Sequence, residues 1–228
     1  MRTIVYEALI FDIDGTLYQT EKVALPAFHS LFEELKRQGI FRGESPTEEK
    51  IVACFGMTIP ELWETLLPDA TMEERDRANE QLAQAELDLM KRGRGQLYPG
   101  VQATLRQLHE QGVKLYTASN GEQRYVETVV ETTGIAPYFT KLFSAGEYKT
   151  KKKEELVERV LDHAGTRSIV MVGDRRSDIT AGKANNLLTV GCDFGFAGQN
   201  ELGDADLIIE QFVDLFPALQ KLAQQKVK

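Results

Sequence analysis

Short apolar runs that alternate with amphipathic helical segments limit this chain to a small set of folds. Between the runs, apolar residues recur at the spacing of one helical face, as Val101, Leu105 and Leu108 do. Strands that alternate with helices in this way form a parallel sheet with helices packed on both faces. We therefore predict an α/β fold with a three-layer core around a parallel sheet. The predicted strands are Ala8–Phe11, Lys114–Ala118, Ser168–Val172, Leu188–Val190 and Leu207–Ile209.

One long segment interrupts this alternation directly after the first strand. From residue 18 to residue 97 the chain shows helical spacing and no convincing strand, with Leu25, Phe28 and Leu35 on one face. The residues Tyr98-Pro99-Gly100 mark a return to the alternating pattern. The simplest organisation is a helical domain of residues 18–97, inserted into a core domain formed by residues 1–17 and 98–228.

Composition disfavours several classes of protein. The chain has 27 Lys and Arg against 35 Asp and Glu, a net charge of −8. This balance disfavours binding to nucleic acids or anionic membranes, which need clustered basic residues. No stretch approaches the roughly 18 apolar residues that a membrane span needs. Cys54 and Cys192 form neither a disulfide framework nor a metal-ligand pattern, so we expect a reducing, cytoplasmic location.

Polar residues follow the predicted strands at the points where those strands end. Asp12 and Asp14 follow the first strand, Ser119 the second, and Asp174 and Asp178 the third. Ligands of an open parallel sheet bind at the carboxyl ends of its strands. If these strands are neighbours, four carboxylates share one crevice, where mutual repulsion raises their pKa values unless a cation is bound. Oxygen ligands in an incomplete protein shell fit Mg²⁺, which keeps water and bridges to phosphate.

Each acidic residue also has a purely structural explanation. An Asp after a strand is often a turn residue or a helix N-cap. For Asp178, which precedes Ile179-Thr180-Ala181, helix capping and a functional role are equally good explanations. Capping explains Asp12 and Asp14 less well, because two acids directly after a buried strand are costly without a partner. Only the combination of all the strand-end residues, in this order, points strongly to function.

Three of these segments resemble motifs of the haloacid dehalogenase (HAD) superfamily. Asp12-Ile13-Asp14-Gly15-Thr16-Leu17 resembles the first motif, Ser119-Asn120 the second, and Gly173-Asp174-Arg175-Arg176-Ser177-Asp178 the fourth. Tyr98-Pro99-Gly100-Val101 resembles the segment that re-enters the core from an inserted cap. The resemblance implies a Rossmann-like core with an α-helical cap of the C1 type, as in phosphatases similar to phosphoglycolate phosphatase.

The third motif of that superfamily is a lysine near a helix N-terminus, often within Lys-Pro-x-Pro, and here the sequence departs from it. Residues 149–157 read Lys-Thr-Lys-Lys-Lys-Glu-Glu-Leu-Val and contain no proline. An alignment without gaps to the predicted helix end at Gly165 places the motif lysine at Lys151. Relatives in which the motif has the shorter form Lys-x-Glu-Leu-Ile place it at Lys153. We favour Lys153, because the residues after it then stay in register and Gly165 still ends the helix.

The resemblance implies a catalytic role for both acids of the first motif. Asp12 is expected to attack phosphorus and form an aspartyl-phosphate. Asp14 is expected to protonate the leaving group and then to deprotonate the hydrolytic water. Dehalogenases and phosphonatases of the superfamily lack an acid at the position of Asp14, so its presence favours a phosphatase or a phosphomutase.

The resemblance also implies which residues bind the cofactor and the phosphate. Mg²⁺ is expected to be the cofactor, and Asp178 is expected to hold its water shell or to orient Asp174. The expected metal ligands are Asp12, Asp14 through its backbone carbonyl, Asp174 and Asp178. The expected phosphate-binding residues are Gly15, Ser119, Asn120 and Lys153.

The predicted function is therefore hydrolysis of a small phosphate monoester or phosphoanhydride by a Mg²⁺-dependent phosphatase. The cap is expected to select this phosphorylated metabolite. Its candidate contacts are Tyr18, Gln19 and Phe55-Gly56-Met57-Thr58, although Phe55 and Met57 fit a cap core equally well. Small phosphate esters, nucleotide monophosphates and sugar phosphates all fit as substrates. We expect the protein to be a monomer or a homodimer.

Two other functions use similar residues. A phosphomutase of sugar phosphates employs the same carboxylates, and no residue in the sequence selects hydrolysis over transfer. A receiver-type phosphoacceptor module also combines strand-end acids, a hydroxyl, a lysine and Mg²⁺. Receiver modules are much shorter, however, and they have no helical insertion after the acidic strand.

Overall fold

Five parallel strands form one sheet in this computed structural model, which describes residues 6–198 and 200–225. The order of the strands across the sheet is β2-β1-β3-β4-β5. The predicted parallel α/β fold is confirmed, and the predicted strands differ from the observed ones only at their ends. The strands are β1 (Ala8–Phe11), β2 (Lys114–Thr117), β3 (Ile169–Gly173), β4 (Leu188–Cys192) and β5 (Leu207–Ile209).

The register of the sheet brings the carboxyl ends of three strands together. Phe11, the last residue of β1, pairs with Thr117 of β2 on one side and with Val172 of β3 on the other. The chain beyond each strand therefore emerges at the same edge of the sheet. All four residues of β1 are buried, as expected of a central strand covered on both faces.

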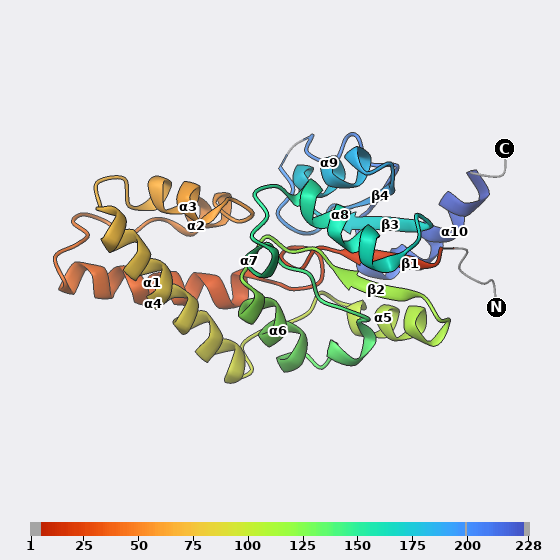
Figure 1. The fold of residues 1–228 in the computed structure, drawn as a ribbon. Coiled ribbons are helices and arrows are strands. Elements are labelled where there is room, and N and C mark those ends of the chain that lie inside the picture. Colours follow the sequence, from red (N-terminus) through yellow and green to blue (C-terminus); the bar gives the residue numbers. More distant parts are fainter. Residues whose placement is uncertain (1–5, 199, 226–228) are drawn as a thin grey trace. The chain divides into compact units, whose positions relative to one another are not determined.

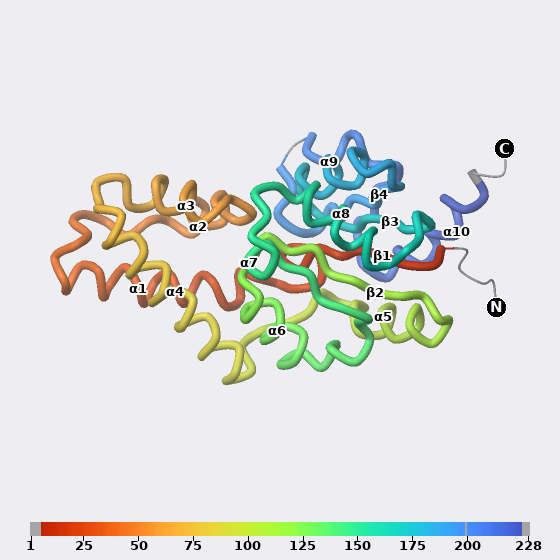
Figure 2. Tube along the Cα trace, viewed as in Figure 1, coloured from red at the N-terminus to blue at the C-terminus, as the bar shows by residue number. Residues whose placement is uncertain are grey.

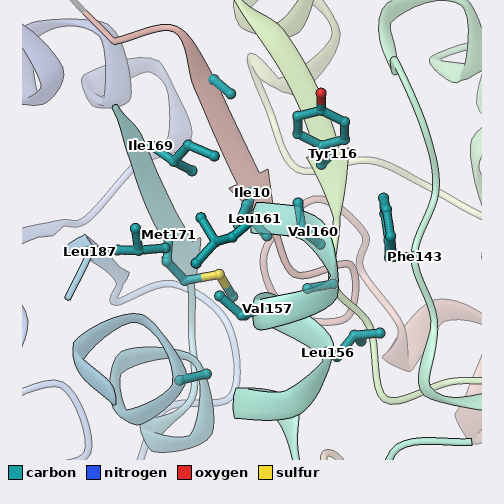
Figure 3. Close-up of a cluster of buried hydrophobic side chains, with 13 residues drawn as sticks. Ile10, Tyr116, Phe143, Leu156, Val157, Val160, Leu161, Ile169, Met171 and Leu187 are labelled. Atoms are coloured by element: carbon teal, nitrogen blue, oxygen red, sulfur yellow. The ribbon is translucent and has the colours of Figure 1, made fainter. Parts of the chain in front are cut away.

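Alternate side chains of the strands pack against helices on opposite faces. Ile10, Tyr116 and Met171 belong to a buried cluster with Val157 and Leu161 of α8, drawn in Figure 3. Figure 1 shows α8 and α9 on one side of the sheet and α5 on the other. These helices are α5 (Val101–Glu110), α8 (Lys153–Ala164) and α9 (Arg176–Ala184).

Further helices complete the sheet-containing part among the described residues. On the face opposite α8, the ring of Phe212 lies 6.1 Å from that of Phe11, measured between centroids. The rest of this part comprises α6 (Gln123–Thr132), α7 (Ala145–Tyr148), α10 (Leu215–Gln225) and the 3-10 helices η1 (Ala136–Tyr138) and η2 (Phe212–Asp214).

Two compact units divide the chain. The core unit includes the residues up to Gln19 and those from Leu97 onward, and the helical unit is Thr20–Gln96. The sequence-based division at 17/18 and 97/98 lies within two residues of these boundaries. At the junction, Tyr18 forms an antiparallel bridge with Leu97, and the side-chain amide of Gln19 donates to the Leu97 carbonyl at 2.7 Å. The core unit therefore closes on itself where the chain leaves and returns.

The helical unit has a core of its own. Its longest helices, α1 and α4, pack against each other, as the tube in Figure 2 traces. The rings of Phe28 and Trp63 lie 6.2 Å apart, and the Trp63 indole N–H donates to Asn79 at 3.0 Å. Among the described helices of either unit, none is both long and apolar enough to cross a membrane. The helices of this unit are α1 (Glu21–Arg37), α2 (Glu48–Ala53), α3 (Ile59–Leu66) and α4 (Met72–Lys91).

Candidate active site

The turn after β1 places Asp12 at the edge of the sheet. The backbone N–H of Asp12 donates to the Val172 carbonyl at 3.0 Å, which extends the pairing of β1 with β3 by one residue. The chain then turns at Gly15, whose φ of +76° lies in the left-handed region that glycine adopts readily. A Cβ on Gly15 would lie 2.2 Å from a carboxylate oxygen of Asp174. The glycine therefore lets the turn approach the end of β3 closely.

Three buried carboxylates converge at this edge. One oxygen from each of Asp12, Asp174 and Asp178 lies within 4.8 Å of the other two. The ammonium group of Lys153, itself buried, lies 2.7 Å from Asp12 Oδ1 and 2.5 Å from Asp178 Oδ1. Three carboxylates and one ammonium leave two negative charges, which a divalent cation would neutralise. The charge and the oxygen ligands both fit a metal ion such as Mg²⁺.

Burial and mutual repulsion make this cluster hold protons. Burial, with the Asp178 carboxylate as the second cause, raises the pKa of Asp174 to about 7. Burial likewise raises the pKa of Asp12 well above its usual range, although Lys153 opposes this shift. Burial alone would lower the pKa of Lys153, but Asp12 and Asp178 outweigh it and raise that pKa. A bound cation would stabilise the ionised acids, so metal and protons compete for the same oxygens.

Asp178 serves the helix and the cluster with different oxygens. Its Oδ2 accepts a hydrogen bond from the backbone N–H of Arg175 at 2.9 Å, in the capping box of α9. Its Oδ1 is the atom bonded to Lys153. Capping and membership of the cluster, which the sequence presents as alternatives for Asp178, are thus both observed.

The structure distinguishes between the two candidate lysines. Lys153 is the first residue of α8 and is buried, with its ammonium inside the acidic cluster. Lys151 is exposed, and its backbone N–H donates to Glu155 Oε2 at 3.2 Å. Of the two candidates, Lys153 is therefore the one that contacts the acidic cluster.

The two residues after β2 differ sharply in burial. Ser119 is fully buried, and its hydroxyl oxygen accepts from the Gly121 N–H at 3.1 Å. Asn120 is exposed and makes no hydrogen bond to the acidic cluster among the described residues. The geometry thus places Ser119 at the edge of the sheet and leaves the side chain of Asn120 toward solvent.

Asp14 stands apart from the three clustered carboxylates. It is half-buried, and its Oδ1 accepts a hydrogen bond from the hydroxyl of Tyr125 at 2.5 Å. Its side chain is not among the clustered carboxylates, which are those of Asp12, Asp174 and Asp178. Sequence reasoning missed Tyr125, because a half-buried tyrosine on an amphipathic helix gives no sign of its distant partner.

A loop after β4 also reaches the cluster, and sequence reasoning missed it too. The backbone N–H of Phe196 donates to Asp174 Oδ2 at 2.7 Å, while Thr16 Oγ1 donates to Asp174 Oδ1 at 3.2 Å. A Cβ on Gly195 would lie 2.1 Å from the Gly15 carbonyl oxygen, so this position also needs glycine. The sequence signal that could have indicated this loop is Gly195 between two phenylalanines, just after a strand.

Comparison with known proteins identifies the family. The sequence model of the haloacid dehalogenase-like hydrolase family matches residues 9–192, which is more than half of the chain. This chain is a haloacid dehalogenase-like hydrolase. The match confirms the resemblance noted in the sequence, and it spans the helical unit and all three strands that border the acidic cluster.

The relatives of this hydrolase are named as phosphatases. Pyrophosphatase PpaX of Listeria monocytogenes is 27% identical over 212 residues, covering 91% of this chain and 93% of the relative. Phosphoglycolate phosphatase of Neisseria meningitidis is 28% identical over 232 residues, covering 94% of each. A crystal structure described as a predicted phosphoglycolate phosphatase from Haemophilus somnus has a TM-score of 0.82 at 21% identity, covering 93% of this chain and 97% of that one.

The structure gives several candidate cap contacts of the hydrolase other tasks. Tyr18 is buried, and Gln19 holds the junction with Leu97. Thr58 is the N-cap of α3, and its backbone N–H and hydroxyl donate to Glu61 Oε2 at 2.9 and 2.7 Å. Met57 is 39% exposed, one of the larger apolar side chains that the helical unit leaves open.

Proposed function

We propose that this hydrolase is a Mg²⁺-dependent phosphatase that cleaves a small phosphate monoester or phosphoanhydride through an aspartyl-phosphate on Asp12. The observation that carries the proposal is the buried cluster of Asp12, Asp174 and Asp178 around Lys153. Its two uncompensated negative charges suit a divalent cation. Its position at the carboxyl ends of parallel strands is where α/β proteins bind ligands.

The residues that would hold Mg²⁺ are Asp12 and Asp174 through their carboxylates and Asp14 through its backbone carbonyl. Asp178 would support them, since its Oδ1 is 2.5 Å from the lysine that also binds Asp12. The metal supplies positive charge that offsets the phosphoryl oxygens and lets an anionic substrate enter an acidic site. Thr16 and the Phe196 N–H keep Asp174 oriented, as partners behind a metal ligand commonly do.

The chemistry follows from the two acids after β1. A carboxylate oxygen of Asp12 attacks phosphorus, the bond from phosphorus to the leaving oxygen breaks, and Asp14 gives that oxygen a proton. Water then attacks the phosphorus, Asp14 takes its proton, and the bond to Asp12 breaks. Lys153 holds Asp12 in place at 2.7 Å. Lys153, Ser119 and the backbone around Gly15 are the groups available to the phosphoryl oxygens.

We infer that the helical unit, residues 18–97 as delimited from the sequence, is a cap that selects the substrate. Segment 55–58 joins α2 to α3 and leaves Gly56 and Met57 exposed. The names of the relatives, a pyrophosphatase and a phosphoglycolate phosphatase, support a small phosphorylated metabolite. The free, buried Cys54 and Cys192 fit a reducing cytoplasm.

The proposal is tested with Asp12→Asn and a matched control, Asp193→Asn. Asp193 also follows a buried strand directly but is exposed and outside the cluster. Hydrolysis of aryl phosphate and of a panel of phosphorylated metabolites is measured with Mg²⁺ and with EDTA. We expect Asp12→Asn to lose at least about a thousand-fold in kcat, and Asp193→Asn to match the parent protein. Mass spectrometry of quenched parent enzyme should locate a phosphoryl group on Asp12.

Full activity of a folded Asp12→Asn protein would refute the proposal, and so would undiminished turnover in EDTA. The products formed from the panel also distinguish a phosphatase from a phosphomutase. A phosphomutase would release an isomeric sugar phosphate in place of inorganic phosphate.

A further inference from the structure

Tyr125 connects α6 to the acid that follows β1. Its hydroxyl donates to Asp14 Oδ1 at 2.5 Å, across 111 residues of sequence. That length is at the short end of the range of about 2.5–2.7 Å for a hydroxyl bonded to a carboxylate, where such bonds are strongest. The bond therefore fixes a side chain that is otherwise only half-buried.

The loop between β2 and α6 is shaped to bring Tyr125 to this place. A Cβ on Gly121 would lie 3.3 Å from Cδ1 of Tyr125 and 3.3 Å from Oγ of Ser119. The glycine thus leaves space for the tyrosine ring beside the residue that ends β2. Tyr125 stands in the first turn of α6, which begins at Gln123, so the helix and the strand position it together.

The acids at the edge of the sheet are all hydrogen-bonded, and two of them share one partner. Asp12 and Asp178 are both bonded to Lys153. Asp178 also accepts from the Arg175 N–H, and Asp174 accepts from Thr16 and the Phe196 N–H. Tyr125 offers Asp14 a neutral hydroxyl, which adds no charge to the site.

We propose that Tyr125 is a positioning residue that holds one carboxylate oxygen of Asp14, so that the other oxygen faces the scissile bond and carries the transferred proton. This inference rests on the proposed function of Asp14 as general acid and base. Oδ1 can accept the hydrogen bond from Tyr125 in both protonation states of Asp14. A protonated carboxyl group carries its proton on one oxygen and still accepts a hydrogen bond through the other, which here is Oδ1. The other oxygen gives its proton to the leaving group and later takes one from water, while the tyrosine keeps its own proton throughout.

If Tyr125 positions Asp14, the loss of activity in a Tyr125 variant should depend on the leaving group of the substrate. An alkyl phosphate needs a proton on its leaving oxygen, whereas nitrophenyl phosphate releases a stable anion and needs none. The quantity to compare is kcat/KM, which reports the steps up to formation of the phosphoenzyme. We expect Tyr125→Phe to lower kcat/KM about ten- to a hundred-fold for an alkyl phosphate and less than about three-fold for nitrophenyl phosphate, because misplacing a general acid removes part of its effect.

Three further variants serve as comparisons for this measurement. Tyr138→Phe removes a hydroxyl from η1, beyond the other end of α6, and should leave both substrates unaffected. Asp14→Asn should show the same preference as Tyr125→Phe, more strongly. Tyr125→His keeps a ring that can donate an N–H and should recover part of the alkyl phosphate activity.

The outcomes separate the two proposals. If Asp14→Asn shows no preference between the substrates, the acid role of Asp14 in the proposed function is wrong. If Asp14→Asn shows it and Tyr125→Phe behaves as the parent protein, the inference about Tyr125 is overturned. An equal loss on both substrates in Tyr125→Phe, together with a lower melting temperature, would show a merely structural role and would also overturn it.

Discussion

At the scale of residues, one ammonium group holds two buried carboxylates while a third lies close by. Lys153 bonds Asp12 and Asp178, and Asp174 is bonded only to neutral donors among the hydrogen bonds described above. The cluster keeps two negative charges in a region of low exposure, a costly arrangement without a counterion. The metal-free protein can relieve this cost only by binding protons, which makes its stability depend on pH.

Metal-free protein should become less stable as pH rises from about 4 to 8. In the folded state the pKa of Asp174 is raised to about 7, from an ordinary value of 3.8. Between these values the folded state binds more protons than the unfolded state, so the free energy of unfolding falls as pH rises. The contribution is on the order of a few kcal/mol at most. Denaturant unfolding in EDTA at pH 5 and pH 8 measures it.

Asp174→Asn is the control for this prediction. The variant should lose part of the difference between pH 5 and pH 8, with the remainder due to Asp12, whose pKa is raised in the same direction. Mg²⁺ should stabilise the parent protein more at pH 8 than at pH 5, because it binds the ionised native site. An unfolding free energy that rises with pH in the same window would contradict the prediction.

At the scale of elements, the loop after β4 is tied to the start of α9. Glu201 accepts from Arg175 Nη1 at 3.2 Å and from the backbone N–H groups of Arg176 and Gly198 at 3.2 and 3.0 Å. Arg175 also donates to the carbonyl of Phe196, whose own N–H bonds Asp174. A carboxylate outside the cluster thus holds the loop that orients Asp174, a proposed metal ligand.

Glu201→Gln should therefore weaken Mg²⁺ binding about ten-fold, since partners behind metal ligands commonly contribute that much. Calorimetric titration of the metal-free protein with Mg²⁺ measures the change. Asp206→Asn is the matched control, because Asp206 pairs with Lys183 at 2.6 Å and accepts from the Thr189 N–H at 2.7 Å, between β4 and β5. This control should lose stability and keep its metal affinity. Equal affinities in the two variants would exclude the proposed role of Glu201.

At the scale of the whole molecule, each unit has its own buried core, and the core unit is closed at the junction. The bridge of Tyr18 with Leu97 and the hydrogen bond from Gln19 join the two chain segments where the helical unit is inserted. The acidic cluster is built entirely from the core unit. Folding of the sheet and formation of the cluster therefore do not need the helical unit.

Replacing residues 20–96 with a short Gly-Ser linker should leave a folded core unit that binds Mg²⁺ and hydrolyses nitrophenyl phosphate. Selectivity should fall: kcat/KM for the preferred metabolite should drop about a hundred-fold or more, because binding energy from the cap is lost. Circular dichroism and the metabolite panel measure both effects. Unchanged selectivity in the shortened protein would refute the role of the helical unit as the cap.

Local patterns predicted much of this molecule. The strands were visible because buried parallel strands are short apolar runs, and the acids were visible because they follow those runs directly. Comparison with the family's third motif, aligned on the predicted helix end, narrowed the lysine to Lys151 or Lys153; α8 ends at Ala164, and its C-cap Gly165 has a φ of +66°. Each of these signals depends on neighbours in the sequence.

The partners of the acids were decided by the tertiary structure alone. Which lysine enters the cluster depends on the packing of α8 against the sheet, which buries Lys153 and leaves Lys151 exposed. Tyr125 meets Asp14, and the Phe196 N–H meets Asp174, because β1, β2 and β3 align their ends at one edge. The sequence by itself determined that acids and a serine follow the ends of buried strands, through turn and strand preferences that act locally. Only the tertiary structure determined which groups hold them in place, since a buried charge binds whatever donor the register and packing of distant segments bring within reach.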